Sequence, residues 1–146
     1  MRRIIVLMGL VAAVGGLMAW RNVSTTTSAD EAAVRAAVDH YMKGIMQYSK
    51  AELEQAFWSE AHIMASSDSR GLFDSPFQKW VGFTEREAPT DTSGYVNTIV
   101  SVDIAGNAAV VKTDLKWPDV RYIDYLSLLK IDGEWKIVNK IFHAER

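Results

Sequence analysis

The chain has 146 residues, of which 49% are hydrophobic, and this length supports one hydrophobic core and therefore one domain. Its formal net charge of −2 is spread over interspersed acidic and basic residues, so no basic stripe is present and nucleic-acid binding is not expected. Cysteine is absent, which excludes disulfides, thiolate zinc sites and thiol nucleophiles.

The N-terminus has the layout of a secretory signal. Arg2 and Arg3 precede 17 uncharged, mostly apolar residues, Ile4–Trp20, and the polar linker Arg21–Ser28 follows. A run of this length is also at the short limit of a membrane-spanning anchor. Under both interpretations the rest of the chain is exported, and it is then periplasmic, secreted or anchored to the membrane. The folded domain is therefore expected over residues 29–146.

Two capping boxes predict two consecutive helices. Ser28 with Glu31 begins a run of apolar residues at helical spacing, which predicts a helix over residues 29–48. Ser49 with Glu52 repeats the signature and predicts a second, shorter helix that ends near Trp58.

The segment after the second helix predicts a small hairpin and a third helix. Two short extended pieces, residues 62–65 and 70–73, flank a serine-rich turn. Ser75 then caps a helix that begins at Pro76 and is expected to end at about Glu87.

Strong turn dipeptides divide the remaining chain into four strands. They are Gly106-Asn107, Pro118-Asp119 and Asp132-Gly133, and each predicts a tight hairpin in a meander from Tyr95 to His143. The fold class is therefore α+β, with three N-terminal helices and a short hairpin packed on a four-stranded antiparallel sheet.

Counting outward from the three turns predicts one continuous apolar face, which the helices must cover. The residues assigned to this inner face are Val96, Thr98, Val100, Val102, Ile104, Ala109, Val111, Thr113, Leu115, Trp117, Tyr122, Asp124, Leu126, Leu128, Trp135, Ile137, Asn139, Ile141 and His143. The pairing leaves five polar residues close together on this face, namely Thr113, Tyr122, Asp124, Asn139 and His143, with Thr113 beside Asp124 and Tyr122 opposite His143. Burying such groups without partners costs about 1–3 kcal/mol each, so the cluster needs an explanation.

Two interpretations of this polar cluster remain open. In one, Asp124 bonds Thr113 and Tyr122 in a satisfied structural network, and His143 lies at the rim. In the other, the cluster lines a ligand cavity beneath aromatic and apolar side chains of the helices. The candidate ligand-binding residues are Tyr41, Ile45, Trp58, Trp80, Phe83, Thr113, Tyr122, Asp124, Asn139 and His143.

The opposite face of the predicted sheet is more apolar than a solvent-facing sheet usually is. It carries Ile123, Tyr125, Leu129, Val138 and Phe142 among polar neighbours. A homodimer formed through this outer face is therefore expected.

Two stretches resemble a known family. AFWSEAHI (residues 56–63) and DYLSLLKIDGEWKIVNKIFH (residues 124–143) are similar to the nuclear transport factor 2-like superfamily, and in particular to its branch described as "putative lumazine-binding", with a likeness that covers about residues 30–146. The resemblance implies a cone of curved sheet wrapped by three helices, with a cavity inside, and many members pair through the outer sheet face. It also implies an aromatic, hydrogen-bonding heterocycle as ligand.

The superfamily contains binding proteins as well as enzymes such as ketosteroid isomerase, so the fold alone does not settle activity. Alignment to the isomerase places Ala65 where that enzyme has its carboxylate base. We therefore expect a protein that binds a small, partly aromatic molecule. The alternatives are a lyase or isomerase that uses Asp124 and His143 as acid and base, and an accessory domain that docks another protein. The three histidines lack metal-ligand spacing, and neither a metal nor a cofactor is expected.

Overall fold

The computed structural model describes residues 28–146, so the apolar run Ile4–Trp20 lies outside the described residues and its role as signal or anchor stays a prediction. Within residues 28–146, no helix is long and apolar enough to cross a membrane. The elements in chain order are α1 (Ser28–Gln47), α2 (Lys50–Ala56), β1 (Phe57–Ser67), β2 (Gly71–Pro76), α3 (Phe77–Trp80), the 3-10 helix η1 (Val81–Glu85), β3 (Val96–Ala105), β4 (Ala108–Trp117), β5 (Val120–Ile131) and β6 (Glu134–Glu145).

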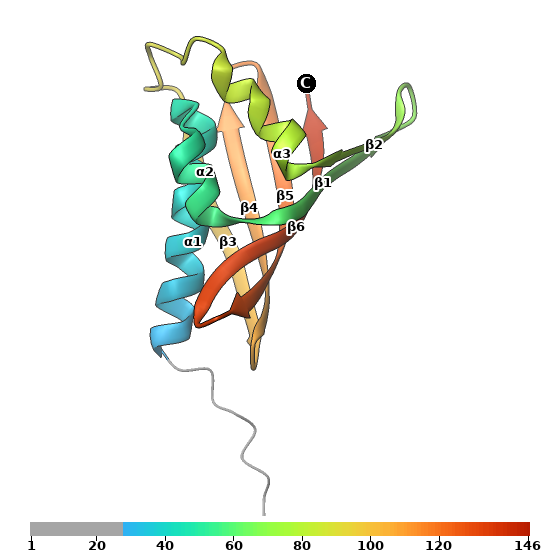
Figure 1. Cartoon of the computed structure of the whole chain (residues 1–146). Helices are drawn as coiled ribbons and strands as arrows, with labels where there is room; N and C mark the ends of the chain where they lie inside the picture. Colours follow the sequence, from blue (N-terminus) through green and yellow to red (C-terminus); the bar gives the residue numbers. More distant parts are fainter. Residues whose placement is uncertain (1–27) are drawn as a thin grey trace, which may run out of the picture.

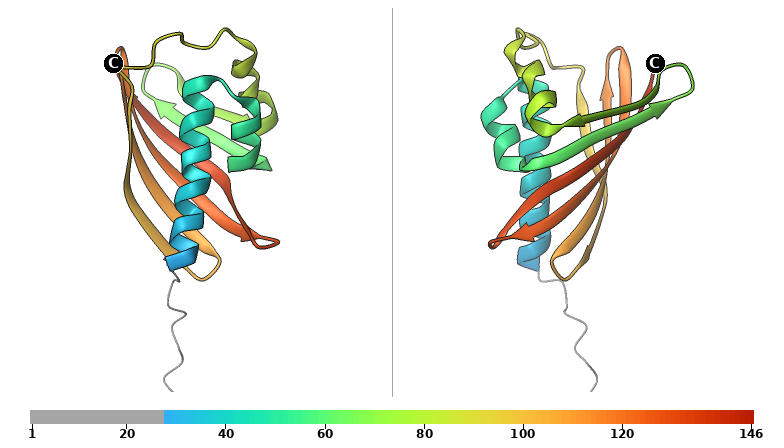
Figure 2. Two further views of the ribbon diagram at one scale, coloured as in Figure 1. Left: turned by 90° about the vertical axis from the view of Figure 1, so that its left-hand side faces the viewer. Right: turned by 45° about the vertical axis from the view of Figure 1, so that its right-hand side comes forward.

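The strands form one curved sheet in the order β2-β1-β6-β5-β4-β3. Helix α1 lies along its concave face, whereas α2, α3 and η1 gather at the wide end of the resulting cone, where β6 also ends (Figures 1 and 2). The side chains between α1, α2 and the concave face form the core, which includes Val34, Val38, Leu53, Val111 and Leu126. The α+β class predicted from the sequence is confirmed.

The short hairpin does not pack on the sheet as predicted but extends it. Strand β1 pairs in parallel with β6, so that His62 lies beside Asn139 and Ile63 beside Lys140, and β2 continues the sheet beyond β1. The sheet therefore has six strands rather than four. Helix α2 ends at Ala56, before Trp58, because the backbone of Phe57 is already extended (φ −99°, ψ 148°).

The third helix is shorter than predicted. Ser75 belongs to strand β2, the α-helix covers only Phe77–Trp80, and the chain then tightens into the 3-10 turn η1. Gly82 lies in that turn, and glycine lowers the helix propensity of the segment.

The register of the meander agrees with the prediction near each turn. Strands β4 and β5 pair as predicted along their length, with Thr113 opposite Asp124. Strands β3 and β4 pair as predicted from their turn up to Ser101, where a bulge at Val100 shifts the register, so that Ile99 lies opposite Thr113. The inward assignment of Val96, Thr98 and Val100 is therefore wrong, and Val96 and Val100 are exposed.

A second bulge reverses the predicted faces of β6. Leu128 lies opposite Ile137, as predicted, but Ser127 lies opposite Asn139, so Val138 is the extra residue. Because side chains alternate along a strand, one extra residue moves every later side chain to the other face. Asn139, Ile141 and His143 consequently face outward, and Lys140 and Phe142 face the concave side.

Candidate functional site

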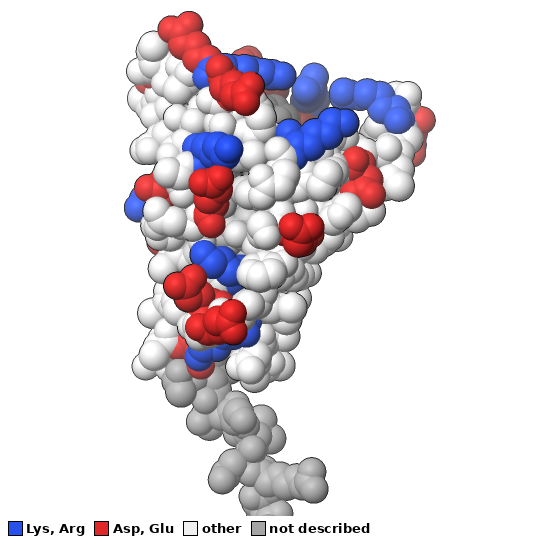
Figure 3. All heavy atoms as spheres, in the orientation of Figure 1, with Lys and Arg blue, Asp and Glu red and all other residues white. Residues whose placement is uncertain are grey.

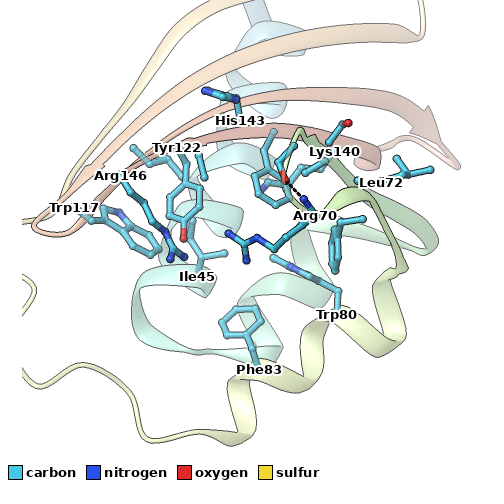
Figure 4. A pocket seen from close by; sticks show the side chains of 18 of the residues that line it. Ile45, Arg70, Leu72, Trp80, Phe83, Trp117, Tyr122, Lys140, His143 and Arg146 are labelled. Atoms are coloured by element: carbon cyan, nitrogen blue, oxygen red, sulfur yellow. Dashed lines mark hydrogen bonds between the residues drawn. The ribbon is translucent and has the colours of Figure 1, made fainter.

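A cavity of about 910 Å³ occupies the wide end of the cone. It lies between α1, η1, the β1–β2 hairpin and the ends of β4, β5 and β6, as Figure 4 shows from close by. Ligand pockets in proteins have volumes of about 300–1,000 Å³, so a small molecule fits this space. Its aromatic lining residues are Tyr41, Tyr48, Phe73, Trp80, Phe83, Trp117, Tyr122 and Phe142.

The floor of the cavity rests on the fully buried carboxylate of Asp124. Its Oδ2 accepts hydrogen bonds from the hydroxyl of Tyr41 at 2.6 Å and from Oγ1 of Thr113 at 3.2 Å. Its Oδ1 lies 3.1 Å from Nζ of Lys140. The predicted network therefore exists around Asp124 and Thr113, but Tyr41 of α1 and Lys140 of β6 complete it in place of Tyr122.

Lys140 is the cation of this network and borders the cavity itself. Its Nζ lies 4.3 Å from the ring centre of Phe142, 5.4 Å from that of Tyr41 and 5.8 Å from that of Trp80, and these aromatic faces stabilise a positive charge. Burial lowers the pKa of Lys140, and the charge and hydrogen bond of Asp124 oppose that shift. An ammonium group has three N–H donors, and among the described residues Asp124 is the acceptor in contact with it.

The two tyrosines nearest this network remain proton donors. Burial raises the pKa of Tyr41 well above its ordinary value, and the neighbouring charge of Asp124 raises it further. Burial also raises the pKa of Tyr122, although the guanidinium of Arg146 lowers it in part. At neutral pH the hydroxyl of Tyr41 therefore donates its hydrogen bond to Asp124, and that of Tyr122 can donate one at the cavity wall.

Three arginines stand at the mouth of the cavity. Arg70, Arg86 and Arg146 all border it, and all three are exposed. In Figure 4 the guanidinium group of Arg70 lies between Tyr122 and Trp80, and that of Arg146 lies next to Tyr122 and Trp117. Lys and Arg side chains also gather at this end of the surface in Figure 3.

The structure divides the ten predicted ligand-binding residues into three groups. Tyr41, Ile45, Trp80, Phe83 and Tyr122 line the cavity. Thr113 and Asp124 are fully buried beneath it and act through Tyr41 and Lys140. Trp58, Asn139 and His143 do not direct their side chains into it.

Two shifts in the fold explain the three misplaced residues. Trp58 follows the buried Phe57 on β1 rather than ending a helix, so its indole turns outward and is 40% exposed. The bulge in β6 turns Asn139 and His143 outward, where the amide of Asn139 contacts the sulfur of Met64. The backbone of β6 at His143 borders the cavity, but its ring lies on the far side of the strand (Figure 4). The predicted acid/base pair of Asp124 and His143 is therefore wrong, because the two side chains lie on opposite faces.

The most important residue that the sequence prediction missed is Lys140. The predicted register placed it on the outer face, together with Phe142. A weak signal was present, because the adjacent apolar residues Ile137 and Val138 interrupt the strict alternation of the strand and permit a one-residue shift. The rim arginines carried no such signal, because they are far apart in the sequence.

A sequence profile described as "Putative lumazine-binding" matches residues 29–143. Among solved structures, a nuclear transport factor 2-like protein of unknown function from Shewanella baltica superposes with a TM-score of 0.73 and 26% identity, over 83% of this chain and 98% of that one. A protein titled putative scytalone dehydratase, from Novosphingobium aromaticivorans, has a TM-score of 0.59 and 15% identity, over 81% and 85% of the two chains, which shows a shared fold.

One curated relative is similar over a short segment. Aldolase FrzH from a Cladobotryum species is 50% identical over 38 residues. The match covers 25% of this chain and 30% of the aldolase, so the chain is matched to less than a third of that relative.

Proposed function

Because the chain belongs to the family described as "Putative lumazine-binding" and has the nuclear transport factor 2-like fold, we propose that it binds a small, partly aromatic molecule in the cavity of the cone. The observation that carries the proposal is the combination, in one space of about 910 Å³, of aromatic walls with a buried ammonium group at the floor. A ligand with a ring to stack and an oxygen to accept a hydrogen bond satisfies both features.

The aromatic walls favour a flat ligand. Trp80 and Phe83 contact each other edge to face, with ring centres 5.0 Å apart, and Trp117 contacts Tyr122 at 5.3 Å. These pairs lie on opposite sides of the cavity opening in Figure 4. A planar ring system that enters between them buries its faces against aromatic carbon on both sides.

The floor supports recognition of an oxygen atom. The Nζ of Lys140 lies 3.1 Å from Oδ1 of Asp124, and an ammonium group has three N–H donors, so donors remain for a ligand. A carbonyl oxygen of a bicyclic heteroaromatic, such as a lumazine, can accept from Lys140 while the rings contact Trp80 and Phe142. Binding of this kind requires hydrogen bonding by the polar cluster but no chemical reaction at it.

The test is a comparison of two tryptophans with lumazine as the probe. Trp80 borders the cavity and Trp58 lies outside it, so Trp80→Leu and Trp58→Leu are matched variants. We expect saturable quenching of tryptophan fluorescence, with an affinity that falls about tenfold or more in Trp80→Leu, as the loss of one aromatic contact of about 1.5 kcal/mol implies, and is unchanged in Trp58→Leu. Failure of lumazine and related bicyclic heteroaromatics to bind, or an equal loss in the two variants, would contradict the proposal.

A second candidate function is carbonyl chemistry at Lys140. A buried lysine whose pKa is lowered is a candidate to form a Schiff base, and the curated relative is named an aldolase. In this reaction Asp124 accepts a proton from the ammonium, and the neutral amine adds to a carbonyl carbon. Water then leaves, and the returning proton gives an iminium that retains the ion pair with Asp124.

Borohydride separates this candidate from simple binding. If the amine reacts, an aromatic aldehyde followed by borohydride leaves a secondary amine on Lys140, which peptide mass mapping locates. Lys130 on β5 and Lys136 on β6 lie outside the cavity lining, so they serve as internal controls. Labelling that is no greater at Lys140 than at these lysines, or that survives Lys140→Met, would leave binding as the function.

A further inference from the structure

We propose that the ligand is an anion, a planar aromatic molecule whose carboxylate or phosphate group is held by Arg70 and Arg86 at the mouth of the cavity. The inference rests on the proposed binding function and specifies the chemical class of the ligand. It comes from the pairing of the arginines and from the charge balance of the cavity.

The described arginines divide according to their position. Arg35 pairs with Glu31 at 2.8 Å, and Arg121 pairs with Asp114 at 2.9 Å and with Glu145 at 3.2 Å. These two lie away from the cavity. The other three in residues 28–146 are Arg70, Arg86 and Arg146, which border the cavity, and none of their guanidinium groups has an ion pair or hydrogen bond with a described residue. The fold thus pairs its arginines elsewhere and leaves those at the mouth available.

The charges around the cavity do not cancel. Lys140 is neutralised by Asp124, with which it forms a buried ion pair. Asp68 is the one carboxylate side chain among the described lining residues, against three guanidinium groups. An anionic group at the mouth relieves the mutual repulsion of the arginines, and the low-dielectric aromatic walls strengthen the attraction.

The arginines reach the space that a ligand would occupy. In Figure 4 the guanidinium of Arg146 lies next to the hydroxyl of Tyr122, and its charge lowers the pKa of that hydroxyl. Arg70 extends from the β1–β2 turn toward the centre of the opening in Figure 4, and Arg86 follows η1, beside the lining residue Phe83. Arg70 and Arg86 thus border the cavity from two different parts of the fold.

The chemistry of the guanidinium group identifies the anionic group. Its planar fork matches the two oxygens of a carboxylate or phosphate, and such charge-assisted hydrogen bonds are the strong ones. With the anion at the mouth, the ring system lies between Trp80 and Tyr122, and an oxygen at its far end faces Lys140. The ligand is therefore anionic at one end and bears a hydrogen-bond acceptor at the other.

The experiment compares probes of one shape and different charge. They are 2-naphthoate, 2-naphthyl phosphate and the neutral 2-naphthalenemethanol, titrated against the full chain and followed by tryptophan fluorescence. We expect at least one anion to bind about tenfold or more tightly than the alcohol at low salt, with a difference that shrinks as salt rises. The two anions separate a carboxylate ligand from a phosphate ligand.

Variants test whether the preference for the anionic probes depends on the arginines at the mouth of the cavity. Arg70→Gln and Arg86→Gln together should remove the preference for the anion and leave alcohol binding unchanged, whereas Arg121→Gln, on the outer face, should change neither. Equal binding of all three probes to the unaltered chain would overturn this inference and leave the proposed function standing. An equal effect of Arg121→Gln would also overturn it, because only the net charge would then matter. Failure of every probe to bind would overturn both.

Discussion

The Asp124→Asn substitution separates charge from shape in the network beneath the cavity. Asparagine has nearly the size of aspartate, and its amide oxygen can still accept a hydrogen bond from Tyr41 or Thr113. What disappears is the negative charge 3.1 Å from Lys140. Both partners are buried, with side-chain exposures of 6% for Lys140 and 0% for Asp124. Removal of one partner from a buried ion pair costs about 3–5 kcal/mol, because the other charge is left uncompensated.

That loss is a large part of the stability of a domain, which is about 5–15 kcal/mol. A matched control is Asp114→Asn, because Asp114 forms an ion pair with Arg121 on the outer face, where solvent screens the interaction. Urea unfolding followed by tryptophan fluorescence should therefore show a much lower free energy of unfolding for Asp124→Asn and almost no change for Asp114→Asn.

The loss should also depend on pH in a definite direction. Burial already lowers the pKa of Lys140, and the substitution removes the charge and hydrogen bond of Asp124 that oppose this shift. In the unfolded chain the lysine pKa is about 10.4, so between the two pKa values the unfolded state binds more protons and stability rises with pH. The deficit of Asp124→Asn should therefore shrink as the pH rises from 7 toward 10.

Two results would refute this reasoning. One is a destabilisation by Asp124→Asn that is no larger than that by Asp114→Asn, and the other is a deficit that stays constant with pH. The double variant Asp124→Asn with Lys140→Met provides a further check. It removes both charges, and it should regain most of the lost stability.

Two further predictions concern packing and assembly. Gly44→Ala should destabilise the chain by about 1–3 kcal/mol in urea unfolding, because the added Cβ would lie 2.5 Å from Cγ of Leu53 at the α1–α2 corner, whereas the control Gly82→Ala meets no atom within 4 Å. A cost no greater than that of the control would mean that the corner can open. We also propose that the outer sheet face, which exposes Tyr125, Leu129 and Ile141, pairs two chains, so light scattering should give twice the mass of one chain and half that value for Leu129→Lys. A monomeric mass for the unaltered chain would exclude this dimer.

The turn residues made most of the meander predictable. Gly106 and Gly133 have positive φ values of 60° and 88°, as tight hairpin turns require, and the register near each turn is as predicted. The bulges at Val100 and Val138 were not predictable by counting, because an extra residue has no strong local signature. The second bulge determined which side chains of β6 face the cavity, because it turned Lys140 inward and His143 outward.

The parallel pairing of β1 with β6 was missing from the prediction for a different reason. The two strands are about 75 residues apart in the sequence, and no turn connects them. The helical half of the site was easier to assign, because Tyr41 and Ile45 belong to one clear apolar stripe of α1. The arginines at the mouth could not be predicted, because only the tertiary fold brings Arg70, Arg86 and Arg146 to the same cavity.

Native mass spectrometry of the chain purified from its own host tests the central claim most directly. The account predicts a bound small molecule, released on denaturation, that absorbs in the near ultraviolet and carries negative charge. It should be present on the unaltered chain and on Trp58→Leu and lost from Trp80→Leu, because only Trp80 of the two borders the cavity. A bare protein mass for the unaltered chain, or the same adduct on Trp80→Leu, would contradict the account.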